Sequence, residues 1–213
     1  MSVVVCAGTK RGLFVFESKT RDRWKMRGPL LPGWSVYHAV VDTRGTPRLH
    51  AAGVSDSFGT TTFSGDLRAK KLVGAKKPPV PPKAPPNAIK MAKRWGISVA
   101  QRVWHVEPGP ARERNVLYAG TAPAGLFRST DGGKTWKELA ALSGHPSRKE
   151  WMPGAGGLAC HSIQIDPSDP KRIFVGISAA GCFRSSDAGK SWTPINRGVR
   201  TFDGSPRKSD VGT

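Results

Sequence analysis

Three histidines hold similar places in a sequence repeat, and their imidazoles are the first candidates for chemistry. His105 and His161 are 56 residues apart and precede matching motifs, and His38 lies in a similar apolar run earlier in the chain. If each begins the innermost strand of one repeat unit, the three side chains converge near a common axis. Such a ring binds a metal ion or an anion, or transfers protons. The alternative is that the histidines hydrogen-bond at strand starts and were copied by duplication.

Aromatic residues accompany these histidines: Trp34, Tyr37, Trp104 and Trp151. Aromatic rings around a polar pocket suit stacking on sugar rings, and the same rings also fill the core between sheets. Both interpretations remain open from the sequence. We take Trp104 and Trp151, together with the three histidines, as ligand-binding candidates, and we expect no resident metal or cofactor.

Carboxylates for hydrolytic chemistry are scarce. Cleavage of a glycosidic bond usually needs two carboxylates that face each other across the sugar, and some enzymes replace one of them by a tyrosine. Glu107 and Glu150 lie near a strand start or in a long loop, and Tyr37 is the candidate for the tyrosine role. These three residues are the catalytic candidates.

The elements that must position these side chains are indicated by a motif that occurs twice. Residues 129–136 read STDGGKTW and residues 185–192 read SSDAGKSW, so both octads follow the pattern S-x-D-x-G-K-[ST]-W. The likeness extends upstream, without a gap, to His105 and His161. In each octad the aspartate accepts hydrogen bonds across its own turn, glycine adopts a positive φ, and tryptophan begins the next strand. The octads therefore predict tight hairpin turns between apolar strands.

The repeat divides the chain into four units of short strands. The units begin at residues 2, 34, 103 and 158, and hold three, four, four and four strand candidates. The first unit has no candidate for an innermost strand. In the second unit a degenerate octad at residues 64–71 keeps only its serine and aspartate. This organisation predicts an all-β fold of blade-like, four-stranded antiparallel sheets. An incomplete ring of such sheets leaves unpaired edges, so we expect self-association through them.

The octads resemble the Asp-box, or BNR repeat, of sialidase-like and sortilin-like β-propellers. The resemblance covers most of the chain outside residues 68–102 and the C-terminal tail. It implies a β-propeller in which the octads are structural turns on the periphery, away from the ligand site. The residues with this implied structural role are Ser129, Asp131, Gly133, Trp136, Ser185, Asp187, Gly189 and Trp192. Relatives of this type are longer, so the resemblance also implies an incomplete propeller, truncated at its C-terminus.

The resemblance implies one of two functions. The first is a sialidase-like glycosyl hydrolase that acts on or binds carbohydrate. The second is a non-catalytic propeller that serves as a scaffold for protein binding or assembly, or a degenerate truncated homologue. A pair of acids, or a tyrosine and a glutamate, at the mouth of the channel distinguishes the first function from the second.

The net charge of +19 is carried in part by a basic, proline-rich insert at residues 68–102. Between Lys70 and Arg94 there are eight basic residues, six prolines and no acidic residue. This composition predicts an extended linker rather than a nucleic-acid groove, since aromatic residues for base stacking are scarce there. We expect a carbohydrate or protein partner and no specific nucleic acid.

The rest of the composition bounds the setting. Three cysteines without a CxxC spacing argue against a disulfide framework, and no apolar run approaches the roughly 18 residues of a membrane span. We expect a cytoplasmic protein without membrane contact. We also expect one partial propeller domain over residues 1–200 and a disordered tail over residues 201–213.

Overall fold

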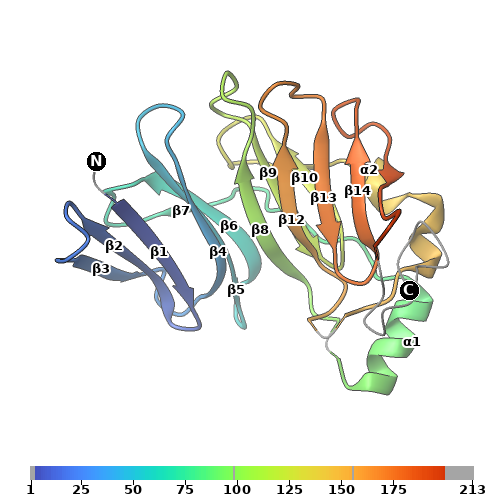
Figure 1. Ribbon diagram of the computed structural model, residues 1–213. Helices are drawn as coiled ribbons and strands as arrows, with labels where there is room; N and C mark the ends of the chain where they lie inside the picture. Colours follow the sequence, from blue (N-terminus) through green and yellow to red (C-terminus); the bar gives the residue numbers. More distant parts are fainter. Residues whose placement is uncertain (1–2, 98, 155, 200–213) are drawn as a thin grey trace.

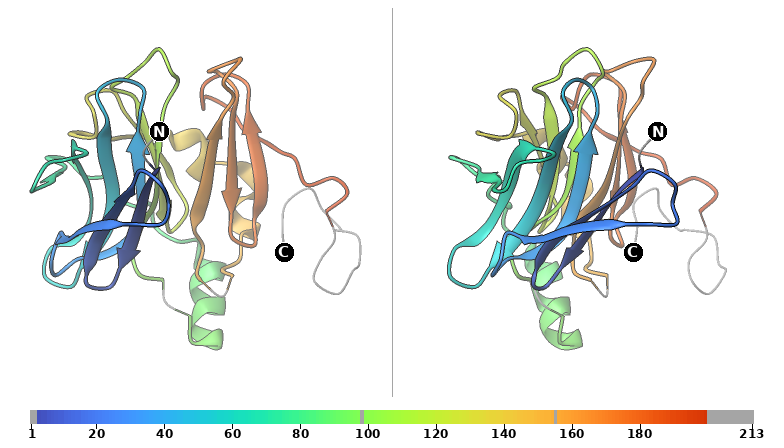
Figure 2. Two further views of the ribbon diagram at one scale, coloured as in Figure 1. Left: turned by 60° about the vertical axis from the view of Figure 1, so that its left-hand side comes forward. Right: turned by 90° about the vertical axis from the view of Figure 1, so that its left-hand side faces the viewer.

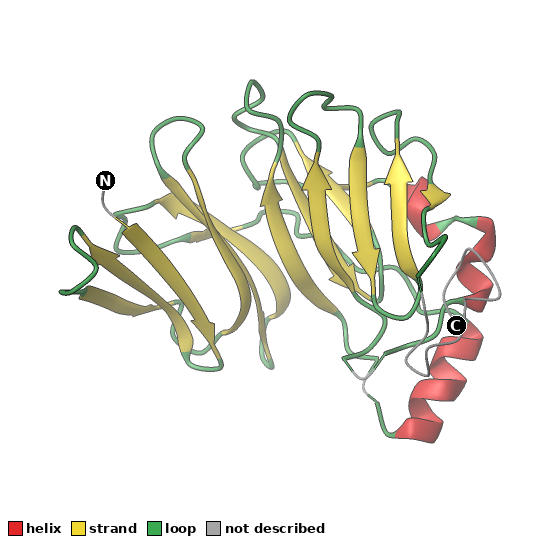
Figure 3. Cartoon of the chain, in the orientation of Figure 1, coloured by secondary structure: helices red, strands yellow, loops and turns green. Residues whose placement is uncertain are grey.

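The computed structural model describes residues 3–97, 99–154 and 156–199, and most of the regular elements that these residues form are β-strands (Figure 3). The first sheet contains three antiparallel strands: β1 (Val3–Thr9), β2 (Gly12–Ser18) and β3 (Lys25–Leu30). The second contains four: β4 (Ser35–Asp42), β5 (Arg48–Ser55), β6 (Gly59–Asp66) and β7 (Val73–Gly74). The third contains β8 (Arg102–Pro108), β9 (Leu117–Ala122), β10 (Leu126–Ser129) and β11 (Lys137–Glu138). The fourth contains β12 (Cys160–Ile165), β13 (Ile173–Ile177), β14 (Gly181–Ser185) and β15 (Thr193–Pro194).

The strand count of three, four, four and four confirms the division into four units. The sheets follow one another along an arc, with the first and the fourth at opposite ends (Figures 1 and 2). The first strands of neighbouring four-stranded sheets contact each other, β4 with β8 and β8 with β12. These three strands therefore line the inner side of the arc. The predicted tail, residues 201–213, lies outside the described residues.

Among the described residues, the first sheet has no counterpart of the innermost strand of the other three sheets. In the third sheet the second strand, β9, packs on β12 so closely that a Cβ on Gly120 would collide with the carbonyl of Cys160. In the first sheet β1 packs on β4 in the same way, and a Cβ on Gly8 would lie 2.6 Å from the carbonyl oxygen of Val36. The strand β1 is thus the equivalent of a second strand, as the sequence predicts.

Apolar residues from both faces of each interface form the core. The first and second sheets share a cluster that includes Leu13, Val15 and Leu49, all fully buried. The third and fourth sheets share a larger cluster, in which Leu126, Ile163, Phe183 and others surround Trp151. Burying side chains of this size contributes about 1.5–3 kcal/mol each, so these contacts hold neighbouring sheets together.

Each octad forms the predicted turn with the same hydrogen bonds. The Ser129 hydroxyl donates to Asp131 Oδ1 at 2.8 Å and accepts from the Gly133 amide at 2.9 Å. Asp131 also accepts from the Thr135 amide and hydroxyl at 2.9 and 2.6 Å. The second octad repeats this set through Ser185, Asp187, Gly189 and Ser191. Both turns lie between the third strand and the short outermost strand, away from the inner side of the arc.

The basic insert does not form the extended linker that its composition predicts. Its middle folds into α1 (Pro86–Trp95), which has proline in its first turn and ends at Gly96 with a φ of 65°. Ala88 and Ala92, one turn apart, are buried, so α1 docks through a small apolar face. The helix lies below the sheets in Figure 1. The described ranges contain no helix with the length and apolar character needed to cross a bilayer.

We call residues 75–97, which include α1, the belt; they begin beside the octad turn of the third sheet and continue to η1. At its start, the Lys76 amide donates to the Lys134 carbonyl at 2.8 Å. Farther along, Arg148 donates to the Lys83 carbonyl at 3.1 Å, and the Asn87 amide group donates to the Lys149 carbonyl. Arg148 and Lys149 belong to η1 (Pro146–Glu150), which follows the short helix α2 (Ala140–Ser143) between the third and fourth sheets. The belt therefore connects the second sheet to the loop that leads into the fourth.

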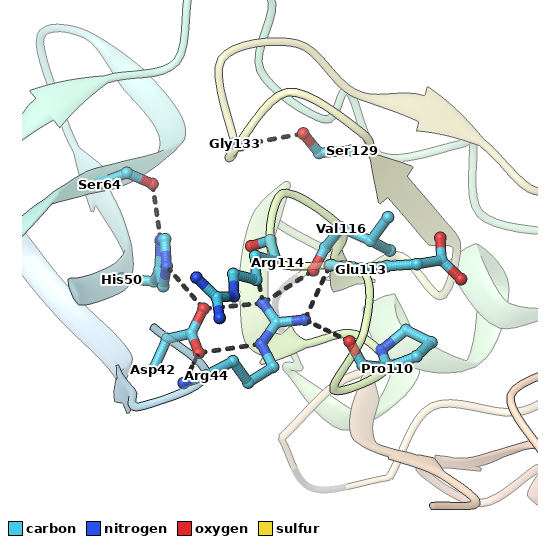
Figure 4. A network of polar contacts seen from close by, with 10 residues as sticks. All are labelled: Asp42, Arg44, His50, Ser64, Pro110, Glu113, Arg114, Val116, Ser129 and Gly133. Carbon is cyan, nitrogen blue, oxygen red and sulfur yellow. Dashed lines mark hydrogen bonds and ion pairs between the residues drawn. The ribbon is translucent and has the colours of Figure 1, made fainter. Parts of the chain in front are cut away.

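A buried polar network joins the end of β4 to the turn between β8 and β9 (Figure 4). The Arg44 guanidinium donates to both carboxylate oxygens of Asp42, at 2.9 and 2.7 Å. It also donates to four backbone carbonyls of the neighbouring turn, those of Pro110, Glu113, Arg114 and Val116. The Arg44 and Asp42 side chains are 11% and 5% exposed. The carbonyls of Pro110, Glu113 and Val116 also accept backbone amides within the turn, so Arg44 adds a second donor to each of them and links the turn to β4.

Candidate functional site

A β-bulge interrupts the first strand of each four-stranded sheet at the same place. The register with the second strand shifts between Val36 and His38, between Val103 and His105, and between Cys160 and Ser162. The bulged residues are therefore Tyr37, Trp104 and His161. Bulges redirect side chains and are common next to functional sites. Here three of them line up on the inner side of the arc.

The bulges correct the alignment that the sequence suggests for the fourth unit. His105 pairs with Gly120, whereas the residue that pairs with Gly176 is Ser162, not His161. The cause is the turn between β12 and β13, which is one residue shorter than the turn between β8 and β9. The sequence likeness without a gap hides this deletion. His161 is thus equivalent to Trp104.

The result is two parallel rows of side chains across the three first strands rather than one ring of histidines. The bulge row contains Tyr37, Trp104 and His161, and the histidine row contains His38, His105 and Ser162. The described residues contain no group of three or more His, Cys, Asp or Glu side chains that is placed to hold a metal ion. The geometry therefore gives no support to the weak metal role of the three histidines.

The histidine row is a polar contact between two sheets. The rings of His38 and His105 are 4.0 Å apart between centroids and are tilted by 32°. The Val106 amide donates to His38 Nδ1 at 3.4 Å, which fixes His38 in the neutral form with its proton on Nε2. Burial, reinforced by the adjacent His105, lowers the pKa of His38 to about 4. His38 is therefore neutral at physiological pH.

Glu107 is the catalytic candidate that the structure places at this site. Its Oε2 atom lies 3.0 Å from His105 Nε2, and the two side chains are 27% and 14% exposed. The carboxylate accepts a hydrogen bond from the Nε2–H group of His105 and so orients the ring. His161 of the fourth sheet lies near enough to His105 for their charges to interact. Partial burial, together with this nearby His105, lowers the pKa of His161.

The bulge row provides an aromatic pair. The rings of Tyr37 and Trp104 stack at 5.3 Å between centroids, and the Arg102 guanidinium lies over Tyr37 at 5.5 Å. Tyr37 is 38% exposed and Trp104 is half-buried. Arg102 was not among the sequence candidates; its position two residues before Trp104, on the same strand, was the signal that could have identified it. The hydroxyl and guanidinium groups give this pair a polar rim.

Two other candidates lie elsewhere. Trp151 is fully buried, with its Nε1 donating to the Ser147 hydroxyl at 3.0 Å and its ring packed against Phe183. Trp151 therefore fills the core between sheets, which is the second of the two roles that the sequence left open, and it is not placed to stack on a ligand. Glu150 is exposed at the end of η1, whereas Glu107 lies on β8. The two glutamates therefore come from different elements and no contact joins them.

A serine, a histidine and an aspartate of the second sheet also lie close together, namely Ser64, His50 and Asp42 (Figure 4). His50 Nδ1 lies 2.8 Å from the Ser64 hydroxyl, and His50 Nε2 lies 3.7 Å from Asp42. A nucleophilic serine needs access to substrate. Ser64 is covered by the third sheet, because a Cβ on Gly133 would lie 2.8 Å from its hydroxyl. Ser64 occupies the serine position of the degenerate octad, and the group is a structural contact between sheets.

The bulge row and the histidine row, which we together call the inner rows, can recognise a ligand through hydrogen bonds and the edges of aromatic rings. The described residues place one carboxylate, Glu107, in the rows, whereas glycoside hydrolysis usually uses two facing carboxyl groups. Tyr37 and Trp104 stack on each other and present their edges. Hydrogen-bond donors and acceptors surround them, namely Arg102, His105 and Glu107.

Two curated relatives match part of the chain. An oligoxyloglucan-reducing end-specific xyloglucanase from Emericella nidulans is 31% identical over 80 residues, which are 37% of this chain and 9% of that protein. A probable enzyme of the same name from Neosartorya fischeri is 30% identical over 82 residues, 38% of this chain and 9% of that protein. The matched segments thus span about a tenth of the relatives' length. No protein-family model matches the chain.

Solved structures establish the fold. The GH74 xyloglucanase from Xanthomonas campestris superposes with a TM-score of 0.61 at 18% identity, over 90% of this chain and 27% of that chain. YCF48 from Cyanidioschyzon merolae superposes with a TM-score of 0.53 at 11% identity, over 89% of this chain and 54% of that chain. At these identities the likeness concerns the fold alone. The protein is all-β, with blade-like antiparallel sheets arranged as in β-propellers.

Proposed function

We propose that the protein is a carbohydrate-binding propeller unit of glycosyl-hydrolase type, and that its ligand contacts the inner rows. The observation that carries the proposal is the alignment of a stacked Tyr37–Trp104 pair with the His105–Glu107 pair on the first strands of neighbouring sheets. Sugars present hydroxyl groups and apolar ring faces, which match a polar rim around exposed aromatic edges.

The names of the curated relatives support the ligand class. One is named an oligoxyloglucan-reducing end-specific xyloglucanase and the other a probable enzyme of that name, although only a short segment of each is matched. We therefore propose xyloglucan-derived oligosaccharides as the first ligands to test. The sialidase-like alternative predicts an anionic sugar at the same rows, and the tyrosine that it requires is Tyr37.

The two octads support membership in a wider group of Asp-box propellers. Both turns have the same four hydrogen bonds around an aspartate, and both lie on the outer side of their sheets. We infer that they are Asp-boxes with a structural role. Ligand contact is then assigned to the opposite edge of each sheet.

The test is a calorimetric titration of the full chain with xyloglucan-derived oligosaccharides and with a sialylated trisaccharide. The proposal expects saturable binding of one class, and a loss of about tenfold or more in affinity for Trp104→Ala, about 1.4 kcal/mol. Trp24→Ala is the matched control, because Trp24 is 42% exposed on the first sheet, away from the inner rows. Equal losses in both variants, or no binding of any sugar, would refute the proposal.

Hydrolysis is measured on the same ligands through the release of reducing ends. If the chain turns over substrate, Glu107→Gln abolishes turnover while leaving most of the binding. If it binds without turnover, the protein is a non-catalytic carbohydrate-binding unit. If the chain neither binds nor hydrolyses any of these sugars, the alternative of a protein-binding scaffold remains. The surface to examine is then the apolar face of the first sheet, where Val5, Trp24 and Met26 are exposed.

A further inference from the structure

A crevice of about 460 Å3 lies between the belt and the outermost strand of the third sheet. Its polar lining is provided by Lys77, Arg128, Thr130, Thr135, Trp136 and Lys137. Leu139 completes the lining, and none of the described residues that line the crevice is acidic. Its volume lies within the range of about 300–1,000 Å3 that is typical of small-ligand sites. It lies at the opposite edge of the sheet from β8, so it is separate from the inner rows and does not depend on the proposed function.

Three cationic residues from three segments line this crevice. Arg128 on β10 and Lys137 on β11 are directly opposite each other in the antiparallel pair. Lys77 enters from the belt through a bridge to Thr135. Like charges directly opposite on neighbouring strands destabilise a sheet. Glu113 offsets part of the Arg128 charge, at 2.9 Å on an exposed surface. Lys77 and Lys137 have no ion-pair partner among the described residues.

The fourth sheet shows that the octad turn itself does not require these cations. Arg184 on β14 is the equivalent of Arg128, and it lies opposite Thr193 on β15. A neutral side chain therefore takes the place of Lys137 beside an octad with identical hydrogen bonds. The paired cations of the third sheet are an addition to the fold, and an anion beside Lys137 would reduce the repulsion that Glu113 leaves.

The remaining lining suits a group attached to the anion. Trp136 is half-buried, and its Nε1 donates to the Thr62 hydroxyl of the second sheet at 2.9 Å, which fixes the indole. Thr130 is exposed and brings a hydroxyl group to the crevice, whereas the Thr135 hydroxyl donates to Asp131 and offers only its oxygen. The crevice thus combines cations, hydroxyls and a rigid aromatic ring.

We propose that this crevice binds a tetrahedral oxyanion, a phosphate or a sulfate, carried on a sugar ring. Lys77, Lys137 and Arg128 hold the oxyanion, and Trp136 contacts the ring. Phosphate and sulfate esters share this chemistry, and the two sources are separated by using both as probes. Binding of the anion relieves the repulsion between Arg128 and Lys137, so it also stabilises the third sheet.

The test titrates the full chain with glucose 6-phosphate, glucose 6-sulfate and inorganic phosphate at 0.15 M salt. Calorimetry reports affinity, and the indole N–H resonance of Trp136 reports the location of binding. We expect a saturable shift of that resonance, with at least one ester binding about fivefold or more tightly than the free ion. The double variant Lys77→Gln/Lys137→Gln should weaken binding about tenfold or more.

The matched control is Lys171→Gln/Lys190→Gln, which removes the same charge near the second octad. Both of its lysines are exposed, so folding is preserved as in the test variant. An equal loss of affinity in the two double variants would show that the net charge of +19 attracts anions diffusely, and the proposal fails. It fails equally if wild type binds none of the probes, or binds the free ion as tightly as both esters.

Discussion

Replacement of Arg44 by methionine is expected to be among the most damaging single changes in this chain. The variant keeps most of the aliphatic stem but removes the guanidinium hydrogen bonds to Asp42 and to the four carbonyls of the turn after β8, and leaves Asp42 the backbone amide of residue 44. Burial raises the pKa of Asp42, but the hydrogen bonds and charge of Arg44 outweigh this, and the net pKa is lowered. Without Arg44, a carboxylate that is 5% exposed loses its counterion.

The magnitude follows from the burial of this pair. Breaking a buried ion pair by removing one partner costs about 3–5 kcal/mol, because the other charge stays buried without compensation. A domain of this kind has a stability of about 5–15 kcal/mol. With a urea m-value of about 2 kcal/mol/M, the unfolding midpoint should fall by about 1.5–2.5 M. The loss therefore amounts to a large part of the total stability.

The assay is urea unfolding followed by tryptophan fluorescence and circular dichroism. The matched control is Arg172→Met, because Arg172 pairs with Asp166 at 2.7 Å after the equivalent strand but is 40% exposed. Exposed pairs contribute about 0–1 kcal/mol, so this midpoint should move by less than about 0.5 M. Adding Asp42→Asn to Arg44→Met should recover part of the loss. The reasoning is wrong if both arginine variants shift the midpoint equally.

Three further predictions concern pH, the octads and the first sheet. Burial lowers the pKa of His38 and of His50 to about 4 from an unfolded value of 6.5, so the unfolded chain binds more protons between these values and stability falls as pH drops from 6.5 to 4. Each histidine should contribute a slope of up to about 1.4 kcal/mol per pH unit, which His50→Gln should reduce in urea titrations at several pH values. Asp131→Ala leaves four donors without their acceptor in a partly solvated turn, and should lower the unfolding free energy by about 1–2 kcal/mol in the same assay. Trp24 and Met26 are 42% and 62% exposed on the first sheet, so light scattering should detect concentration-dependent self-association that Trp24→Ser/Met26→Ser reduces; a wild type that stays monomeric contradicts this.

The sequence predicted the architecture because the repeat is dense in local signals. The serine, aspartate and glycine of each octad determine their own turn through contacts within five residues, so Asp131 and Asp187 behave alike whatever surrounds them. The same local logic predicted the missing first strand of the first sheet. The helix α1 was missed because eight cations and six prolines outweighed its capping signals, Pro86 and Gly96, and because its docking face consists of two alanines.

The candidate site was harder to predict because it depends on register between strands. A turn shorter by one residue moves His161 into the bulge row and places Ser162 beside the histidines. Sequence alignment detects no such shift when flanking residues match. Burial was equally invisible for Trp151, whose place in the core is decided by contacts with Phe183 and Ser147, distant and near in the chain.

The uneven attachment of the sheets has a consequence for the way the molecule opens. The belt hydrogen-bonds to the second sheet, to the octad turn of the third sheet and to η1, so it couples these two sheets to the loop that leads into the fourth. The first sheet is held by β1 and β2 on β4 and by Arg27, which donates to the carbonyls of Leu67 and Ala69. We therefore expect two cooperative units in hydrogen exchange, with amides of β1–β3 exchanging at a lower opening free energy than those of β8, β9 and β13.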